Sequence, residues 1–584
     1  MNLRFLLFLF VATVVFSACN SLPDHAKYIP KDAVVVVGLN TKKIGKQIAW
    51  SALIGSKLFN EMKTSLPPKH ALEGLGDAGI EHMSTSYLYV KNYRDADAGT
   101  RITALVPLDD AGKWEVYVKR TFPNTTIKEA DGRKEANLVD GMYVGWTKDL
   151  LIVMNIIENQ VSIKKSLDTS FADSSLLASK DSFIAEGSPT TFAANEQLLS
   201  SEMKNAFTIQ KNNAITDDAR FKKMETDGHD ITVWMNYDIL MSENSDKMGM
   251  PSQLALGSTL WKQAAFSGGF DFEKGKITGD MLYYTSEELR NVAEEFGSKN
   301  ADKELLERLP AQNLNMLMAF HLSTKGLKGL LEKIGVLGFA NLALSSEGIS
   351  TDDIFEAFTG DLGVAVNDFT MNYSSHRDSS KDSSTINYSS QNTTMNFLYT
   401  MKIGNKEKFN KLMTYLQQKQ LLTPIENNLF TSSFSDSMFL TFDNNYIAVS
   451  NKSDYARAYL AGKFKAEPTP AVIKNDVYNH PIGMYLSFQT ILASIKPHQN
   501  SGITDSVALQ ESRNLLDNLV FNGGEYSKNA FSYKFALNLV NKKENAIFQL
   551  MNFAMKMNEA AENEKASKGK NAVHAGAFEQ NQYH

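Results

Sequence analysis

An internal duplication constrains this chain most, because two copies of one sequence pattern imply two copies of one fold. The apolar segment Ala33 to Leu39 predicts a strand and is followed by the polar start of a helix, TKKI, at Thr41. The same unit returns in the second half as the strand Leu314 to Leu322 and the segment TKGL at Thr324. A strand followed by a helix therefore opens each half of the chain.

Further correspondences follow in the same order along both halves. They comprise two predicted hairpins, an aromatic position within a strand, and a Gly-Gly pair. The matched segments are Asp140–Trp146 with Asp436–Phe442, Leu150–Val153 with Tyr446–Val449, Trp234 with Tyr485, and Phe266–Gly269 with Phe521–Gly524. The spacing between matches implies that the first copy holds an extra segment of about 45 residues, polar and helix-like, within 156–230.

The patterns predict an α+β protein with two tandem related domains, each a largely antiparallel twisted sheet with a few helices. The predicted domains span residues 29–300 and 305–557. Polar, low-complexity residues 372–394 are predicted to form a long hairpin loop. Residues 558–584 lack a core-forming pattern and are predicted to be a disordered polar tail.

The N-terminus has the order of a bacterial signal peptide. A basic residue, Arg4, precedes the apolar run Phe5 to Phe16, and the small residues Ser17 and Ala18 precede Cys19. The run is too short for the roughly 30 Å hydrocarbon core of a membrane. Residues 1–18 are thus predicted to be cleaved and residues 19–28 to form a polar leader.

Cys19 is the only cysteine in the chain, so it has no internal disulfide partner. The tetrad that ends at Cys19 resembles the lipobox of bacterial lipoproteins, although Phe16 stands where Leu is usual. This resemblance implies that palmitate and other acyl chains on Cys19 anchor the mature chain to a membrane. The alternative is an ordinary secretory signal followed by a stray cysteine.

Charge and composition exclude some classes of protein. A net charge of −6 over 584 residues, with scattered basic residues, is not the footprint of a nucleic-acid binder. A content of 43% hydrophobic and 22% charged residues is typical of globular proteins and excludes a polytopic membrane protein.

The sequence contains no motif that a known reaction requires, and we assign no catalytic residue, metal ligand or cofactor. It lacks the G-x-S-x-G elbow of serine hydrolases and the H-E-x-x-H pattern of zinc hydrolases. Asp271 to Lys276 has the wrong ligand spacing for calcium and is interpreted as a hairpin turn. A pair of carboxylates for glycoside hydrolysis stays open, since only geometry identifies such a pair.

Exposed tryptophans are candidate sugar-binding platforms, because sugars stack on their rings. Four of the five tryptophans match an apolar residue in the other copy, which favours packing in the core. These four are Trp114, Trp146, Trp234 and Trp261. Trp50 differs because it matches Lys333 and points away from the face of Ile44 and Ile48. We therefore predict Trp50, with Ile54 nearby, as a contact for a ligand or partner; the alternative is a second packing face.

The strand segments IPKDAVVVVGLN at Ile29 and FTGDLGVAVND at Phe358, together with the lipobox, resemble a family of uncharacterised Bacteroidota lipoproteins (domain of unknown function 4836). The likeness covers nearly the whole mature chain. It implies a location in the cell envelope and supplies no activity, cofactor or catalytic residue.

The sequence thus favours a membrane-anchored envelope lipoprotein with a non-catalytic binding or scaffolding role, whose partner is an envelope protein or a glycan. The alternative is a hydrolase of glycan or cell-wall material that uses carboxylates. The segment after Cys19 lacks an acidic cluster that resembles a surface-export tag, which favours the periplasmic side.

Overall fold

The computed structural model describes residues 22–47, 74–92, 100–138, 142–157, 189–244, 260–377, 387–433, 435–496 and 503–579. The chain divides into two compact units. Unit 1 comprises residues 1–246 and 265–270, and unit 2 comprises residues 247–264 and 271–584. Each unit is described by itself.

Unit 1 combines mostly short strands with helices, of which α6 (Pro189–Phe207) is the longest described one. Its elements are η1 (Asp24–Tyr28), β1 (Val35–Asn40), α2 (Thr41–Gln47), η2 (Leu75–Asp77), β2 (Thr85–Asn92), β3 (Thr100–Pro107), α5 (Ala111–Thr121), β4 (Ile127–Ala130), β5 (Arg133–Asn137), β6 (Tyr143–Trp146), β7 (Leu150–Ile157), α6 (Pro189–Phe207), η3 (Lys211–Asn213), η4 (Ile215–Asp217), α7 (Ala219–Asp227), β8 (Ile231–Asn236), α8 (Tyr237–Asn244) and the first six residues of β9 (Ala265–Glu273).

The strands of unit 1 pair in the order β9–β8–β1–β2–β3–β7–β6–β5–β4, always antiparallel. The first described strand, β1, thus lies inside the sheet between β2 and β8. This position explains its unbroken apolar sequence, because an inner strand contributes side chains to both faces.

Unit 2 has longer strands and a long C-terminal helix. Its elements are β10 (Lys276–Tyr284), η5 (Glu287–Leu289), α10 (Arg290–Phe296), α11 (Lys303–Glu307), β11 (Leu314–His321), α12 (Thr324–Lys333), α13 (Leu337–Ser345), α14 (Thr351–Ala357), β12 (Phe358–Arg377), β13 (Asn387–Ile403), α15 (Lys406–Gln418), β14 (Leu422–Glu426), β15 (Leu429–Ser432), β16 (Ser435–Phe442), β17 (Tyr446–Ser450), α16 (Ser453–Leu460), η6 (Lys463–Ala466), α17 (Ala471–Asp476), β18 (Ile482–Ser487), α18 (Phe488–Ser494), α19 (Ile503–Leu515), β19 (Leu516–Ser527), β20 (Ala530–Leu539) and α20 (Ala546–Glu579).

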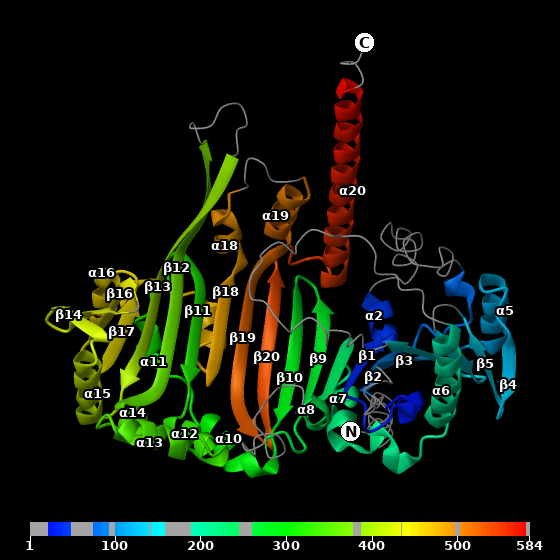
Figure 1. Cartoon of the computed structure of the whole chain (residues 1–584), viewed down its shortest axis with the longest axis horizontal. Coiled ribbons are helices and arrows are strands. Elements are labelled where there is room, and N and C mark those ends of the chain that lie inside the picture. Colours follow the sequence, from blue (N-terminus) through cyan, green and yellow to red (C-terminus); the bar gives the residue numbers. More distant parts are fainter. Residues whose placement is uncertain are drawn as a thin grey trace, which may run out of the picture. The chain divides into compact units, whose positions relative to one another are not determined.

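The strands of unit 2 pair in the order β10–β20–β19–β18–β11–β12–β13–β17–β16–β15–β14, again antiparallel throughout. Figure 1 shows the central strands of this unit side by side. The prediction of mixed helix and largely antiparallel sheet is therefore confirmed.

The main core of unit 2 lies on one face of its sheet. Leu317, Ala365 and Leu398 point into it from β11, β12 and β13, and each is fully buried. Helices α11, α16 and α17 cover this face with Leu305, Leu306, Ala456, Tyr459 and Ile473. We call it the helix-covered face.

The tryptophans of unit 1 confirm the prediction of core packing at three positions. Trp114, Trp146 and Trp234 are 5%, 2% and 1% exposed. Helix α5 carries Trp114 into a cluster with Trp146, and its N-terminus is capped by the Asp110 side chain, which accepts hydrogen bonds from two backbone N–H groups. Trp261 is partly exposed instead, because it lies in a turn outside any strand.

The predicted hairpins are confirmed as β6–β7 and β16–β17. The turn predicted at 271–276 is confirmed but shorter, because β9 continues to Glu273 and β10 begins at Lys276, with Gly275 between them at a φ of +68°. The loop predicted at 372–394 is instead largely strand, because β12 and β13 pair out to Arg377 and Asn387. Helices α6 and α7 lie within the extra segment predicted at 156–230.

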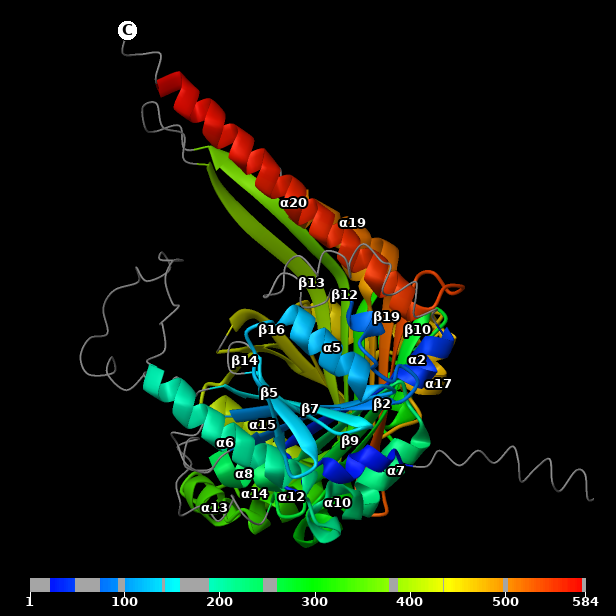
Figure 2. The ribbon, with the colours of Figure 1, turned by 90° about the vertical axis from the view of Figure 1, so that its right-hand side faces the viewer.

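The prediction of a disordered tail from residue 558 is wrong within the described residues, because helix α20 continues to Glu579. Ala560 is 3% exposed, and Lys556 pairs with Glu511 of α19 at 2.6 Å. Figure 2 shows the two helices side by side. This part of α20 packs against α19, and the sequence pattern of the tail does not predict that contact. Among the described helices, none is both long and apolar enough to cross a membrane.

Candidate functional site

The face of the unit 2 sheet opposite the helix-covered face is also apolar. Its seven central strands run from β13 to β10, and their register places three positions of each strand in three rows. The first row is Met401, Leu362, Phe320, Ile482, Gly523, Tyr533 and Met281. The second is Tyr399, Val364, Met318, Met484, Phe521, Phe535 and Gly279. The third is Phe397, Val366, Met316, Leu486, Leu519, Leu537 and Ile277. We call these positions the open face.

The open face contains no charged residue, and the hydroxyls of Tyr399 and Tyr533 are its only side-chain oxygens. Burial raises the pKa of both tyrosines, as expected for phenols in apolar surroundings. All nineteen of its side chains other than glycine are partly exposed. By contrast, Leu317 and Ala319, which alternate with Met316 and Met318 along β11, are completely buried.

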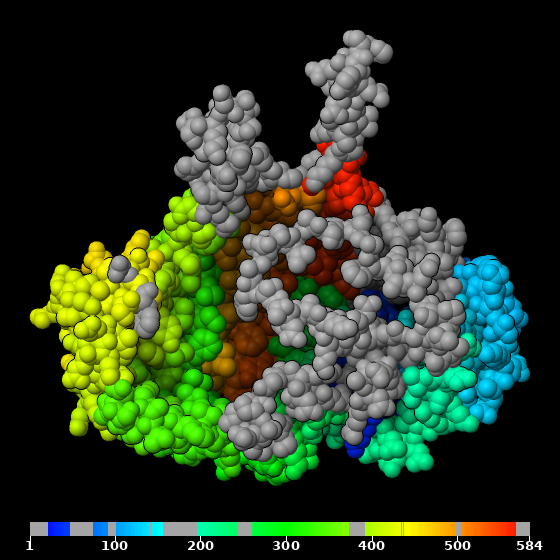
Figure 3. Space-filling model, viewed as in Figure 1, coloured from blue at the N-terminus to red at the C-terminus, as the bar shows by residue number. Residues whose placement is uncertain are grey.

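Helices lie around the open face, and none of the described helices crosses its middle (Figure 1). Met401 at one edge packs against the cluster that includes Phe409 of α15. Ile277 and Leu537 at the other edge pack against the cluster that includes Ala546 at the start of α20. Figure 3 shows coloured atoms of β18 to β20 set back in a recess. The open face is thus the floor of a depression with a helical rim.

Unit 1 has a comparable apolar face on its own sheet. Most side chains of β1, β2, β3, β7 and β8 that share this face are apolar and partly or fully exposed, whereas Ser86 and Asn155 are polar and Leu151 is buried. The exposed apolar members are Val35, Val37, Leu39, Leu88, Val90, Ile102, Ala104, Val106, Val153, Ile231, Val233 and Met235. Leu39 and Leu88 are 38% and 43% exposed. Each unit therefore has one sheet face that its described helices leave partly uncovered.

A small polar pocket of about 270 Å³ in unit 1 is lined by residues that include Gly38 of β1, Thr232 of β8 and Glu225 of α7. The carboxylate of Glu225 lines it and accepts two hydrogen bonds, one from the Tyr87 hydroxyl and one from the Thr232 hydroxyl, both at 2.6 Å. Burial raises the pKa of Glu225, and the two hydrogen bonds and nearby His229 oppose this only in part. Burial, followed by the charge of Glu225, also raises the pKa of Tyr87.

The glycine in β1 makes room for this polar cluster. A Cβ atom on Gly38 would lie 2.4 Å from Thr232 Oγ1 and 3.2 Å from Glu225 Oε1. His229 lies in the pocket wall, with its ring over Gly269. The pocket can bind a small polar group, but Glu225 is the only carboxylate among the described residues that line it. Glycoside hydrolysis needs two carboxyl groups, about 5 to 9.5 Å apart.

Two larger hollows of unit 1, of about 460 and 450 Å³, contain acidic residues that are already paired. Glu196 in the first pairs with Lys128 at 2.9 Å. Glu115 in the second pairs with Lys134 at 2.6 Å, and hydrogen bonds from Lys119 and Lys134 lower its pKa. These carboxylates bind neighbouring lysines, which suits structural roles better than proton transfer.

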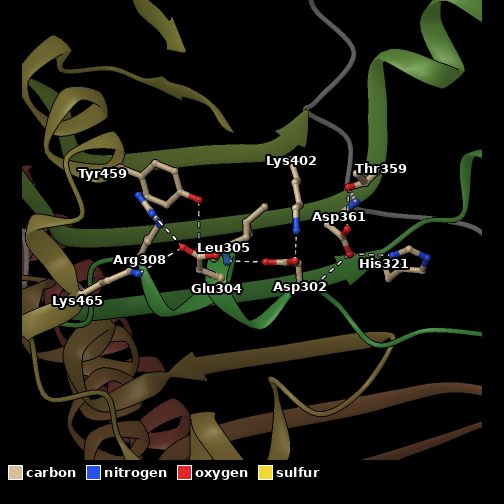
Figure 4. A network of polar contacts seen from close by, with 10 residues as sticks. All are labelled: Asp302, Glu304, Leu305, Arg308, His321, Thr359, Asp361, Lys402, Tyr459 and Lys465. Carbon is tan, nitrogen blue, oxygen red and sulfur yellow. Dashed lines mark hydrogen bonds and ion pairs between the residues drawn. The ribbon is translucent and has the colours of Figure 1, made fainter. Parts of the chain in front are cut away.

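A buried histidine–aspartate pair lies in unit 2 (Figure 4). His321 Nδ1 is 2.8 Å from Asp361 Oδ1, and Asp361 also accepts hydrogen bonds from the Thr359 hydroxyl and the Asp302 backbone N–H. Burial favours a higher pKa for Asp361, but the hydrogen bonds from His321 and Thr359 lower it below its usual value. Asp302 caps α11 and pairs with Lys402 of β13. The network therefore ties α11 to the sheet.

The predicted site residues Cys19, Trp50 and Ile54 lie outside the described residues. The open face and the Glu225 pocket were both missed by sequence reasoning. The sequence does contain a signal for the open face. Strand β11 is apolar at every position from Met316 to Phe320 (MLMAF), which indicates apolar side chains on both faces. The pocket had none, because Tyr87 and Glu225 are far apart in the chain. Across the described ranges, no group of three or more His, Cys, Asp and Glu side chains is placed to hold a metal ion.

Comparison with protein-family models and with curated proteins gives no match. Among solved structures, the chain is similar to crystal forms III, IV and I of TP0453, at 8% to 9% sequence identity. These matches cover 44% to 46% of this chain and 79% to 81% of that chain, with TM-scores of 0.23 to 0.24. A likeness of this size carries no argument about fold or function.

Proposed function

We propose that this protein is an envelope lipoprotein, anchored through Cys19, that binds an apolar ligand on an uncovered sheet face without catalysing a reaction. The open face of unit 2 carries this proposal. Nineteen partly exposed apolar side chains together present on the order of several hundred Å² of apolar surface, the size at which such patches mark interaction sites.

The two halves are further proposed to be copies of one domain, and strand pairing supports this. In each sheet, a row of residues that pair across successive neighbouring strands can be followed, and we call this row a rung. In unit 1 it runs through Gly145, Ile152, Leu105, Tyr87, Gly38 and Thr232. In unit 2 it runs through Thr441, Ala448, Thr400, Gly363, Ala319 and Gly483.

Sequence alignment independently matches both ends of these rungs, Gly145 with Thr441 and Thr232 with Gly483. Six strands thus keep the same order and the same register in both halves. Unrelated domains are not expected to share the same strand register at each residue, so this agreement favours duplication.

Hydrolysis of glycan or cell-wall material is the weaker proposal. The Glu225 pocket offers one carboxylate, and the acidic residues of the two larger hollows are neutralised by lysines. The anchor, a periplasmic location and membership of the uncharacterised Bacteroidota lipoprotein family remain proposals that rest on the N-terminal sequence and the strand motifs.

Two measurements test this proposal. Metabolic labelling with palmitate is expected to mark the wild-type chain and to be lost in Cys19→Ala. The Cys19→Ala protein is then expected to enhance the fluorescence of anilinonaphthalene sulfonate, a dye that brightens on apolar surfaces, without losing its folded circular dichroism. Absence of dye binding by the folded protein would contradict a binding role for the open face.

A further inference from the structure

Resting on the proposed binding function, we infer that the open face of unit 2 holds the acyl chains of one membrane phospholipid. The chemistry of the face, its dimensions and its rim all support this occupant.

The chemistry of the face excludes occupants that bring hydrogen-bonding groups. A peptide in extended form presents backbone N–H and C=O groups, which cost free energy when they are buried without partners. The three rows offer such groups only two hydroxyls, on Tyr399 and Tyr533. Hydrocarbon chains need no hydrogen-bond partners, so they match this surface better than a peptide or a sugar.

The methionines suit a ligand whose chains vary in length and unsaturation. Met316, Met318 and Met484 lie beside one another at the centre of the face, on paired strands β11 and β18. Methionine is flexible and polarizable, and it recurs at surfaces that accept several apolar partners. Phe521 and Tyr533 stack nearby with ring centroids 5.6 Å apart, which adds a firm apolar floor.

The dimensions of the face fit a lipid with two chains. Seven strands spaced about 4.8 Å apart span roughly 29 Å, and three rows of alternate residues span roughly 14 Å. An acyl chain extends about 15 Å within one leaflet, half of the roughly 30 Å hydrocarbon core. Two chains therefore lie within the face side by side.

The rim favours a single lipid over the bilayer itself. Met401 at one edge and Ile277 at the other already pack against helical clusters, so the floor is recessed between them. A flat bilayer surface meets such a rim before it meets the floor. A lipid that leaves the bilayer can instead reach Met318 and Met484.

The experiment uses the full mature chain with Cys19→Ala, so that no acyl chain of its own competes. The protein is incubated with vesicles of phosphatidylethanolamine and phosphatidylglycerol, separated from them and examined by native mass spectrometry. We expect an added mass equal to one diacyl lipid. Met484→Lys is expected to lose at least nine-tenths of this adduct, whereas Leu342→Lys, which changes a 73% exposed leucine of the same unit, keeps it.

A second measurement uses lysophosphatidylcholines with decanoyl, lauroyl and myristoyl chains as competitors of the dye. Affinity is expected to rise about fourfold for each methylene that the face buries, or roughly fifteenfold for each two-carbon step. Met484→Gln, which changes polarity but hardly changes size, supplies a variant that should fold if Met484→Lys does not. Its lysolipid affinity is expected to fall at least threefold.

Failure of the inference differs from failure of the proposed function. Dye binding without lipid uptake, or lipid uptake that Met484→Lys and Met484→Gln leave unchanged, would overturn the phospholipid assignment alone. Protein that sediments with vesicles but never carries lipid away would show docking on the bilayer and would also overturn it. Loss of both dye and lipid binding in the folded protein would overturn both proposals.

Discussion

Substitution of Gly38 by alanine tests the packing between β1 and the Glu225 cluster. The new Cβ would lie 2.4 Å from Thr232 Oγ1, a distance that requires the threonine to move. Movement of Thr232 breaks its 2.6 Å hydrogen bond to Glu225. Overpacking lowers the free energy of unfolding by about 1 to 3 kcal/mol, and loss of such a hydrogen bond lowers it by about 1 to 3 kcal/mol. Replacing a glycine in a strand by alanine raises it by about 0.5 to 1 kcal/mol. We expect a net loss of about 2 to 4 kcal/mol.

The double variant Gly38→Ala/Thr232→Gly makes this expectation refutable. It reproduces the pair found at the corresponding rung of unit 2, where Ala319 faces Gly483. Thr232→Gly alone should lose the hydrogen bond. Adding Gly38→Ala should then cost much less than it does in the wild type, because the clashing hydroxyl is gone and only the contacts with Tyr87 at 3.1 Å and Glu225 at 3.2 Å stay tight. The double-mutant cycle should therefore show a coupling energy of about 2 kcal/mol.

Urea unfolding followed by tryptophan fluorescence measures this cycle. Trp114, Trp146 and Trp234 all belong to unit 1, so their signal reports on the unit that carries the substitutions. Additive free energies of unfolding would refute the reasoning, since they would mean that the new methyl group and Thr232 do not meet.

Three further predictions concern stability. Trp234→Ala should lower the free energy of unfolding by about 3 to 5 kcal/mol, as for a large core residue. Trp261→Ala, which changes a partly exposed residue, should lower it by less than half as much. Equal losses would contradict the different burial of the two residues. Glu225 has a raised pKa in the folded state, so its contribution to stability is greatest at pH below the unfolded value near 4.3 and is lost as pH rises through the folded pKa. Denaturation of wild type and Glu225→Gln should therefore show wild type losing stability relative to the variant from pH 4 to pH 8, and a constant difference would count against the shift. Ala560→Arg should destabilise the contact of α20 with α19 by about 1 to 3 kcal/mol in thermal unfolding, whereas Glu562→Ala should change it by less than about 0.5 kcal/mol.

Mixed helix and antiparallel sheet could be predicted because strand alternation and turn residues are local signals. The apolar strand at Ala33 and the hairpins near Trp146 and Phe442 all lie where their sequences place them. Apolar residues on both faces of β11 were equally visible. The sequence could not say which face the helices cover, because that depends on contacts such as Tyr459 with Leu305.

The polar cluster could not be predicted for a related reason. Tyr87, Glu225 and Thr232 come from β2, α7 and β8, and only the pairing of β1 with both strands brings them together. The helical C-terminus was missed because its residues carry no apolar stripe of the usual width. Around Ala560 the helix packs against α19, a contact between distant parts of the chain that no local pattern indicates.

One sheet face of unit 2 is accessible and apolar, and the single native cysteine allows a direct test of this property. In a Cys19→Ala background, one new cysteine is placed at Met484 on the open face, at Leu317 on the helix-covered face, or at exposed Leu342. The rate of maleimide labelling of the folded protein is then measured with and without phospholipid. We predict that Met484→Cys reacts far faster than Leu317→Cys and that lipid protects it while leaving Leu342→Cys unaffected. Labelling of Met484→Cys as slow as that of Leu317→Cys would contradict an open face.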